Sequence, residues 1–179
     1  GPPDYIIIRT KPHGEGECVG DKTYYEFDTD TYYAAGYNIT RGYLGDANAT
    51  WTSSNTSVCT VTTPGKSTTL TAISEGSCNV TAQYGGVTNV TGTITDKPVI
   101  TVDDSGGADY LTIQEAIDAA SPGDHIFVYN GTYHEHVDVY KTVVIKGESK
   151  GETVIDGDDN STGTVVFITA NNVTIDLSL

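Results

Sequence analysis

DYLTIQEAIDAASPGDHIFVYNGTYHEHVDVYKTVVIKGESKGETVIDG, residues 109–157, is the stretch that decides the fold of the second half of the chain. It opens with the one convincing helix of the sequence, residues 112–120, where Thr112 can cap the first turn and Glu115 stands three residues later. The Ser-Pro-Gly-Asp segment at residues 121–124 ends that helix. Short strand-like runs separated by turn residues follow, so this half is predicted to consist of strands with a single helix.

One face of the predicted helix is apolar, so the helix is expected to cover an apolar surface. The same stretch resembles the start of a right-handed parallel β-helix of the pectin-lyase-like superfamily, and the resemblance spans residues 99–179. In that superfamily a short helix plugs the N-terminal end of the solenoid, and a G-x-Y-x-E segment opens the first full coil. Tyr133 and Glu135 occupy that segment here. The resemblance implies a short β-helix with a helical cap.

The first half reads as short strands with turn residues every 8–12 positions, a spacing typical of β-sandwiches. TWTSSNTSVCTV (residues 50–61) and LTAISEGSCNVTAQYGG (residues 70–86) resemble the bacterial Ig-like (Big) module of surface adhesins and wall proteins. The match covers about residues 41–95. Some members carry cysteines at the two positions that Cys59 and Cys78 occupy, so the resemblance implies a disulfide between them.

Together these patterns predict an all-β protein, an Ig-like β-sandwich followed by a short right-handed parallel β-helix with one N-terminal capping helix. We expect an extended arm at residues 1–23, the sandwich at 24–97 and the β-helix at 98–179, with Asp96-Lys97-Pro98 as the linker. The YIII run within residues 3–9 has no partner in the Ig-like motif, which suggests strand addition to another subunit. The open end near residues 173–179 is a second expected docking edge.

The charge balance excludes several classes of partner. The chain carries 24 acidic and 9 basic residues, a formal net charge of −15, which repels phosphate backbones and anionic lipid heads. No nucleic acid is therefore expected as a partner. Membrane insertion is not expected either, because no apolar run approaches the ~18 residues of a span. Since the sequence contains no Met, Gly1 is not expected to be a native start.

Asparagine usage points to export. Eight of the nine asparagines stand in N-x-[S/T] sequons, where chance would place roughly two. The predicted N-glycosylation sites are Asn38, Asn48, Asn55, Asn79, Asn89, Asn130, Asn160 and Asn172. Turn-like surroundings favour Asn130 and Asn160 among them. The chain is accordingly expected outside the cell, at a cell surface or in a cell envelope.

The three cysteines leave one without a partner inside the chain, or else they form intermolecular bonds. Cys18 lies in an acidic, Gly-rich stretch, residues 14–20, outside the Ig-like motif. We expect an intermolecular disulfide at Cys18, and the alternative is a reduced thiol under a loop. Cys/His spacings typical of zinc sites are absent from the sequence.

No catalytic residue and no cofactor are predicted. Neighbouring carboxylates occur at residues 103–104 and 158–159, but adjacent residues of a strand point to opposite faces and cannot flank one sugar bond. They are interpreted as turn residues. His134 and His136 share one strand face, yet no third metal ligand is indicated, so an exposed pair is expected.

A weak calcium candidate is formed by Asp156, Asp158 and Asn160, whose oxygens have the 1, 3, 5 spacing of a calcium loop. Ser161 stands where that loop requires Gly, and Phe167 stands where it requires Glu. A solvated turn between coils is therefore the preferred interpretation, and no metal is predicted.

These features suggest a structural subunit of an extracellular, glycosylated protein envelope of S-layer or sheath type, resembling archaeal cell-surface proteins that combine Ig-like and solenoid modules. Its partners would be other copies of itself, joined by β-edge addition, and covalent N-glycans, and it would not be an enzyme. The alternative is the truncated N-terminal part of a secreted polysaccharide-binding or -processing β-helix protein. Tyrosines within residues 24–43 would form either a sugar-binding face or sandwich core. A native reading frame that stops near Leu179 would favour the envelope subunit.

Overall fold

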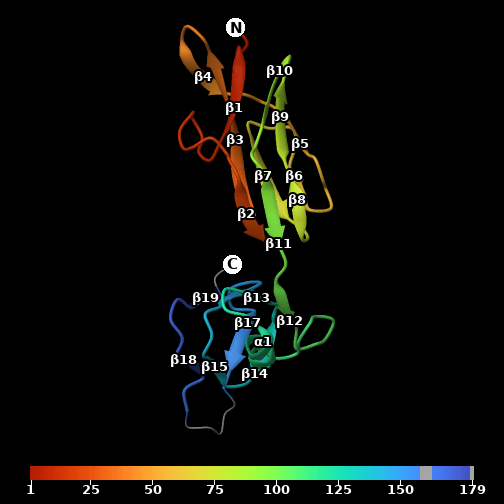
Figure 1. Cartoon of the computed structure of the whole chain (residues 1–179), viewed down its shortest axis with the longest axis vertical. Coiled ribbons are helices and arrows are strands. Elements are labelled where there is room, and N and C mark those ends of the chain that lie inside the picture. Colours follow the sequence, from red (N-terminus) through yellow and green to blue (C-terminus); the bar gives the residue numbers. More distant parts are fainter. Residues whose placement is uncertain (158–162, 178–179) are drawn as a thin grey trace. The chain divides into compact units, whose positions relative to one another are not determined.

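The computed structural model describes residues 1–157 and 163–177. The chain divides into two compact units, Gly1–Pro98 and Val99–Leu179, and each has a hydrophobic core of its own. Strands dominate both units, and α1 (Ile113–Ala119) is the one α-helix of the described residues (Figure 1). The predicted all-β class is confirmed.

The first unit is built from short, mainly antiparallel strands in three sheets. Their orders are β1-β3-β7-β6 with β4 beside β3, β10-β9-β5, and β2-β11-β8. The strands are β1 (Tyr5–Arg9), β2 (Lys22–Tyr25), β3 (Thr29–Asn38), β4 (Gly42–Asp46), β5 (Thr50–Ser53), β6 (Cys59–Val61), β7 (Ser67–Ala72), β8 (Gly76–Cys78), β9 (Val80–Tyr84), β10 (Val87–Val90) and β11 (Ile94–Lys97). The buried residues Val80 and Ala82 alternate along β9 with half-buried or exposed ones, as expected for a strand with one face on a core.

The core of the first unit is centred on large side chains from different sheets. Trp51, Tyr32 and Leu70 are each no more than 1% exposed. The indole Nε1 of Trp51 donates to the carbonyl of Gly65 at 2.9 Å, so its one polar group is satisfied. Cys59 on β6 and Cys78 on β8 form a disulfide with a Cα–Cα distance of 6.6 Å. This bond links two sheets across the core.

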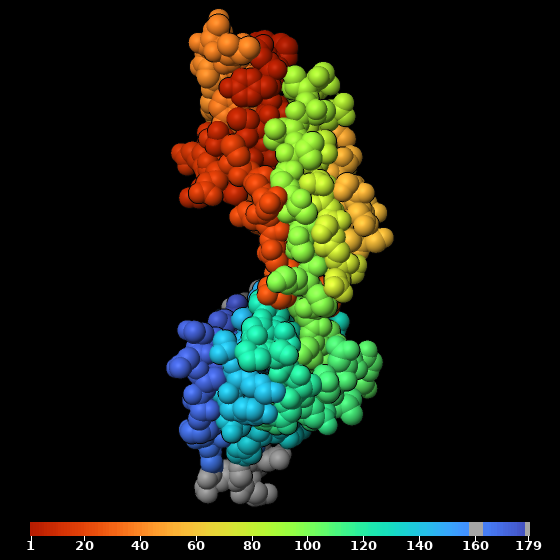
Figure 2. Space-filling model, in the orientation of Figure 1, coloured from red at the N-terminus to blue at the C-terminus, as the bar shows by residue number. Residues whose placement is uncertain are grey.

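The N-terminal segment belongs to the first unit and is not a separate arm. β1 pairs antiparallel with β3, from Tyr5 opposite Tyr37 to Arg9 opposite Tyr33. Alternate residues of β1 are buried in the core, and the N-terminal residues (red) lie packed against the other strands of the unit (Figure 2). The premise that residues 3–9 have no partner within the chain is therefore wrong, whereas their use for strand addition between subunits stays a prediction. Their partner lies outside the region that carries the Ig-like motif, so the motif could not reveal it.

The expected linker is shorter than predicted. Asp96 and Lys97 are the last residues of β11, which pairs in parallel with β2 and antiparallel with β8. Only Pro98 lies between this strand and the second unit. Proline cannot donate to a ladder, which explains why the strand ends there.

In the second unit, strands of successive coils pair in parallel. The strands are β12 (Ile100–Val102), β13 (His125–Val128), β14 (Gly131–His134), β15 (Val137–Val139), β16 (Val144–Gly147), β17 (Thr153–Asp156), β18 (Val166–Ile168) and β19 (Thr174–Asp176). They form the sheets β12-β13-β16-β19, β14-β17 and β15-β18, each with parallel pairing. Ile126, Ile145 and Ile175 are aligned on neighbouring strands, so similar side chains stack along the interior. This is the arrangement of a parallel β-helix.

The helix α1 packs against the interior of these coils. The Thr112 side chain accepts a hydrogen bond from the amide of Glu115 at 3.2 Å, so the predicted N-cap is confirmed. Ile113, Ala116 and Ile117 are fully buried beside Val102 and Ile126. The apolar face read from the sequence is thus the face that covers the coil interior.

Candidate functional site

Charged side chains from the coils hold both ends of α1. The Glu135 carboxylate accepts hydrogen bonds from the first two amides of the helix, at 2.8 and 2.9 Å. At the other end, Lys141 Nζ donates to the carbonyl oxygens of Asp118 at 2.6 Å and Ala120 at 3.0 Å. These bonds satisfy groups that a helix leaves without partners, and both charges complement its macrodipole. Each oxygen of Glu135 accepts one helix amide, so this carboxylate has a structural role at the start of α1.

Tyr133 ties β14 to the preceding coil. Its hydroxyl lies 2.9 Å from the Tyr129 carbonyl and 3.2 Å from the Val102 carbonyl, and the side chain is 2% exposed. Burial, followed by the negative charge of Asp104, raises the pKa of Tyr133 to about 12. The phenol therefore remains a protonated hydrogen-bond donor at neutral pH. Tyr133 and Glu135, which the superfamily resemblance singled out, both have structural roles here.

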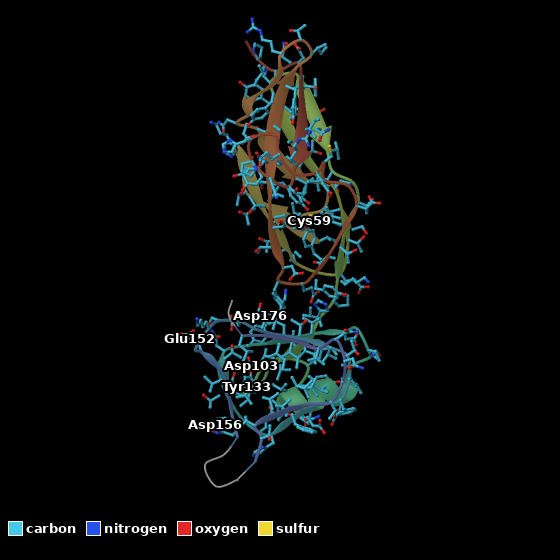
Figure 3. The ribbon with its side chains drawn as sticks, turned by 90° about the vertical axis from the view of Figure 1, so that its left-hand side faces the viewer. Cys59, Asp103, Tyr133, Glu152, Asp156 and Asp176 are labelled. Atoms are coloured by element: carbon cyan, nitrogen blue, oxygen red, sulfur yellow. A yellow bond between two sulfur atoms is a disulfide. The ribbon has the colours of Figure 1, made fainter. Side chains whose placement is uncertain are left out.

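A groove of about 360 Å³ opens beside these two residues. It is lined by Asp104, Leu111, Thr112, Thr132, Tyr133, His134 and Glu135. Figure 3 labels Tyr133 and Asp156 on the side of the second unit formed by β14 and β17. Leu111 is 55% exposed, so the groove combines an apolar surface with hydroxyl, imidazole and carboxylate groups. Such a mixture suits ligands with both polar and apolar faces, such as sugars.

His134 is the titratable group at the edge of this groove that is paired with a carboxylate. It lies opposite Asp156 in the β14–β17 register, with Nδ1 3.4 Å from Oδ2. The two side chains are 60% and 43% exposed, so the pair is well solvated. His136 points to a different partner, because its Nδ1 lies 2.9 Å from the carbonyl oxygen of Thr164. The two histidines therefore do not form a common site.

No metal site is assembled in the part of the chain that the structure describes, since no three His, Cys, Asp or Glu side chains come together there. Asp156, the first residue of the weak calcium candidate, lies beside His134. Asp158 and Asn160 fall outside the described residues.

The neighbouring carboxylates of residues 103–104 act as turn residues. Asp103 Oδ1 accepts from the Ser105 hydroxyl at 2.7 Å and from its amide at 2.9 Å, and the hydroxyl bond, then the amide bond, hold the pKa of Asp103 below its usual value. Asp104 Oδ2 accepts from the amide of Thr132 at 3.2 Å. The two carboxylates thus have separate partners and do not face one substrate. The second such pair, residues 158–159, lies outside the described residues.

The predicted modification sites lie at varied depths. Cys18 is a free, exposed cysteine, and the intermolecular disulfide expected for it stays a prediction. Asn160 lies outside the described residues. The exposed sequon asparagines are Asn48, Asn55, Asn130 and Asn172, and the half-buried ones are Asn38, Asn79 and Asn89.

Asp96 is a buried carboxylate that no sequence pattern singled out. It is 1% exposed, and neither carboxylate oxygen has a hydrogen-bond partner among the described residues. Burial raises the pKa of Asp96 to about 6, and the negative charges of Glu26 and Asp28 add to that rise. Its position two residues before Pro98 suggested a linker, because the strands that pair with it lie far away in the sequence.

Comparisons with known proteins concern part of the chain. No family model matches it. A putative pectinesterase/pectinesterase inhibitor 38 from Arabidopsis thaliana is 37% identical over 81 residues, which is 40% of this chain and 17% of the relative. Probable pectinesterase/pectinesterase inhibitor 17 from the same plant is 37% identical over 79 residues, or 42% of this chain and 15% of the relative. The chain therefore spans less than a fifth of either curated relative.

This similarity is consistent with the pectin-related β-helix resemblance and runs against the expectation of a non-enzymatic protein. Most of each relative lies outside the match. The resemblances to a bacterial Ig-like module and to archaeal envelope proteins gain no support from it. No helix of the described residues has the length and apolar character needed to span a bilayer.

Proposed function

We propose that this chain belongs to a secreted β-helix protein that binds or processes a polysaccharide of the pectin class, and that the groove beside Leu111 and His134 contacts the polymer. The observation that carries the proposal is the 37% identity to two proteins named as pectinesterases, in a chain whose second unit has the strand pairing of a parallel β-helix. This was the alternative interpretation of the sequence. The similarity supports it better than it supports an envelope subunit.

The net charge of the chain limits which polysaccharides are favoured as ligands. A net charge of −15 repels an unesterified polyuronide, which carries one carboxylate per sugar. Methyl esterification removes that charge and adds an apolar methyl group. The exposed Leu111 offers an apolar contact for such a group, while the Thr112 and Thr132 side chains line the same groove as hydrogen-bonding partners. We therefore propose a methyl-esterified polymer as the preferred ligand.

The test is affinity electrophoresis of the whole chain in gels containing highly methyl-esterified pectin, polygalacturonate or dextran. We expect retardation in esterified pectin, weaker retardation in polygalacturonate and none in dextran. Leu111→Ser removes an apolar contact worth about 1.5 kcal/mol, so affinity should fall by about tenfold. Leu44→Ser is the matched control, because Leu44 is a 42% exposed leucine in the first unit. No retardation in any polymer, or equal retardation of wild type and Leu111→Ser, would contradict the proposal.

Ester hydrolysis is measured separately, by methanol release from the same pectin. We expect none from this chain alone, because Glu135 caps α1 and the Asp104 carboxylate accepts a backbone amide. Methanol release that is lost in His134→Gln would show that the groove is catalytic. Self-assembly into an envelope stays a prediction, and electron microscopy of the native material tests it.

A further inference from the structure

The sequons of this chain differ in how their asparagine side chains are bonded. Asn38 Oδ1 accepts hydrogen bonds from the Thr40 hydroxyl at 2.6 Å, the Thr40 amide at 3.0 Å and the Arg41 amide at 3.2 Å. All three donors lie within three residues of Asn38. No described residue accepts a hydrogen bond from its Nδ2. The loop after β3 thus folds on itself and leaves the carboxamide nitrogen available.

Asn55 has the same local pattern. Its Oδ1 accepts from the amide of Ser57 at 3.1 Å, and its own amide donates to the Ser53 hydroxyl at 3.2 Å. The backbone carbonyl of Asn55 accepts from Val58 and Cys59, which continues the local turn. The residue is exposed, and its Nδ2 has no acceptor among the described residues.

Asn79 is bonded to a distant part of the chain. Its Nδ2 donates to the carbonyl oxygens of Gly92 at 2.9 Å and Thr91 at 3.4 Å. Its backbone amide donates to the Ser54 hydroxyl at 2.8 Å. These partners are 12 to 25 positions away, so the carboxamide is a tertiary contact of the first unit.

The side chain of Asn130 forms hydrogen bonds with residues about 20 positions later in the second unit. Its Nδ2 donates to Glu152 Oε2 at 3.2 Å, and its Oδ1 accepts from the Ser149 hydroxyl at 2.8 Å and the Thr153 hydroxyl at 3.3 Å. The backbone amide of Asn130 donates to Glu148 Oε2 at 2.9 Å. Exposure alone would not reveal this difference, because Asn130 is exposed whereas Asn38 is half-buried.

We infer that Asn38 and Asn55 accept N-linked oligosaccharides in the folded chain, and that Asn79 and Asn130 do not. In the transfer, Nδ2 attacks the anomeric carbon of a lipid-linked oligosaccharide. A C–N bond forms, the amide loses one proton, and the glycosidic C–O bond breaks so that the lipid phosphate leaves with the electron pair. The transferase and its lipid-linked donor supply everything except the asparagine.

The reason is that an acceptor segment must leave its own fold to enter the transferase. At Asn38 and Asn55 the hydrogen bonds of the carboxamide itself are local, and its Nδ2 has no acceptor among the described residues. Each sequon is also held to a distant residue by a backbone group, since the Ile39 amide donates to Asp4 Oδ2 at 2.9 Å and the Ser57 carbonyl accepts from the Ser74 hydroxyl at 2.7 Å. At Asn79 and Asn130 the Nδ2 atom itself donates to acceptors 12 or more positions away, so these bonds must break before Nδ2 can attack. Transfer at these two sites is therefore expected to be slower in the folded chain than in a peptide.

The test offers the folded, unglycosylated chain to a purified single-subunit oligosaccharyltransferase with a lipid-linked oligosaccharide, and follows each site by glycopeptide mass spectrometry. The same four sequons as short synthetic peptides correct for local sequence preference. Relative to its peptide, we expect each of Asn38 and Asn55 to react at least about tenfold faster than Asn79 or Asn130, the factor that corresponds to about 1.4 kcal/mol. The double variant Ser149→Ala/Glu152→Ala, which removes the acceptor of Asn130 Nδ2, should raise the rate at Asn130 and leave Asn38 unchanged.

Two results would overturn the inference. In one, Asn79 or Asn130 in the folded chain reacts as fast as Asn38 after correction by the peptides. In the other, Asn38 and Asn55 stay unmodified while their peptides react. Neither result depends on polysaccharide binding, so the proposed function and this inference fail separately.

Discussion

Replacing Asp96 by Asn is expected to remove a pH-dependent part of the stability of the first unit. Asp96 is 1% exposed at the end of β11, and its oxygens have no hydrogen-bond partner among the described residues. Burial raises its pKa from 3.8 to about 6, and the charges of Glu26 and Asp28 contribute to the rise. The amides of Lys97 and Ile73 oppose this rise without meeting the geometry of a hydrogen bond.

The sign of the effect follows from the direction of the shift. Because the folded chain binds this proton more tightly than the unfolded chain, the stabilisation is complete below pH 3.8 and is lost as pH rises through about 6. At about 1.36 kcal/mol per pKa unit, the difference between 3.8 and about 6 corresponds to about 3 kcal/mol. Above pH 6 the first unit therefore holds a buried, ionised carboxylate that lowers its free energy of unfolding.

Trp51 makes the measurement specific to the first unit, since it is the single tryptophan of the sequence and is 1% exposed there. Urea unfolding followed by its fluorescence between pH 4 and pH 8 gives the free energy of unfolding of wild type and Asp96→Asn. The variant should gain up to about 3 kcal/mol relative to wild type as pH rises across this range. For Glu75→Gln, which changes an exposed carboxylate of the same unit, the free energy of unfolding should depend on pH in the same way as in wild type. If the free energy of unfolding of Asp96→Asn also follows the pH dependence of wild type, the buried carboxylate is not the source of that dependence.

Three further predictions concern other interactions. Glu135→Ala should lower the free energy of unfolding of the second unit by about 1–2 kcal/mol, because two helix amides lose their acceptor. Hydrogen exchange at α1 should accelerate in this variant, and unchanged exchange would exclude a capping role. Replacing Cys59 and Cys78 by Ser should lower the free energy of unfolding of the first unit by about 3 kcal/mol, given the 19-residue separation, as measured by Trp51 fluorescence in urea. An unchanged urea midpoint would refute that estimate. Cys18→Ser should leave the fold intact and abolish any disulfide-linked dimer on a non-reducing gel, and dimers that persist would show that Cys18 is not the cross-link.

Local sequence signals identified the features that depend on neighbouring residues. The N-cap at Thr112 and the apolar face of α1 follow from spacing alone, and the structure contains both. The superfamily resemblance also drew attention to Tyr133 and Glu135. It gave their position in the coil, whereas their hydrogen bonds show that one ties coils together and the other caps the helix.

Features that depend on distant partners were not predictable. β1 was interpreted as an unpaired strand because β3, its partner, lies outside the recognisable Ig-like motif. Asp96 was interpreted as part of a linker because its strand partners, β2 and β8, lie far from it in the sequence. Lys141 gave no sign of its role at the end of α1, because the carbonyls that it contacts lie more than 20 positions earlier in the chain.

The groove of the second unit is lined both by residues whose polar groups support the fold and by residues with large exposed surfaces. Tyr133 and Glu135 line it, but their polar groups are used in hydrogen bonds that hold the coil and the helix together. Asp104 accepts the Thr132 amide in the same way. The polar group of His134 instead faces an exposed carboxylate in water, where a pair contributes little to stability, and Leu111 presents more than half of its surface. A substitution at Leu111 should therefore change ligand binding while the unit stays folded, so a loss of binding in that variant can be interpreted as a property of the groove.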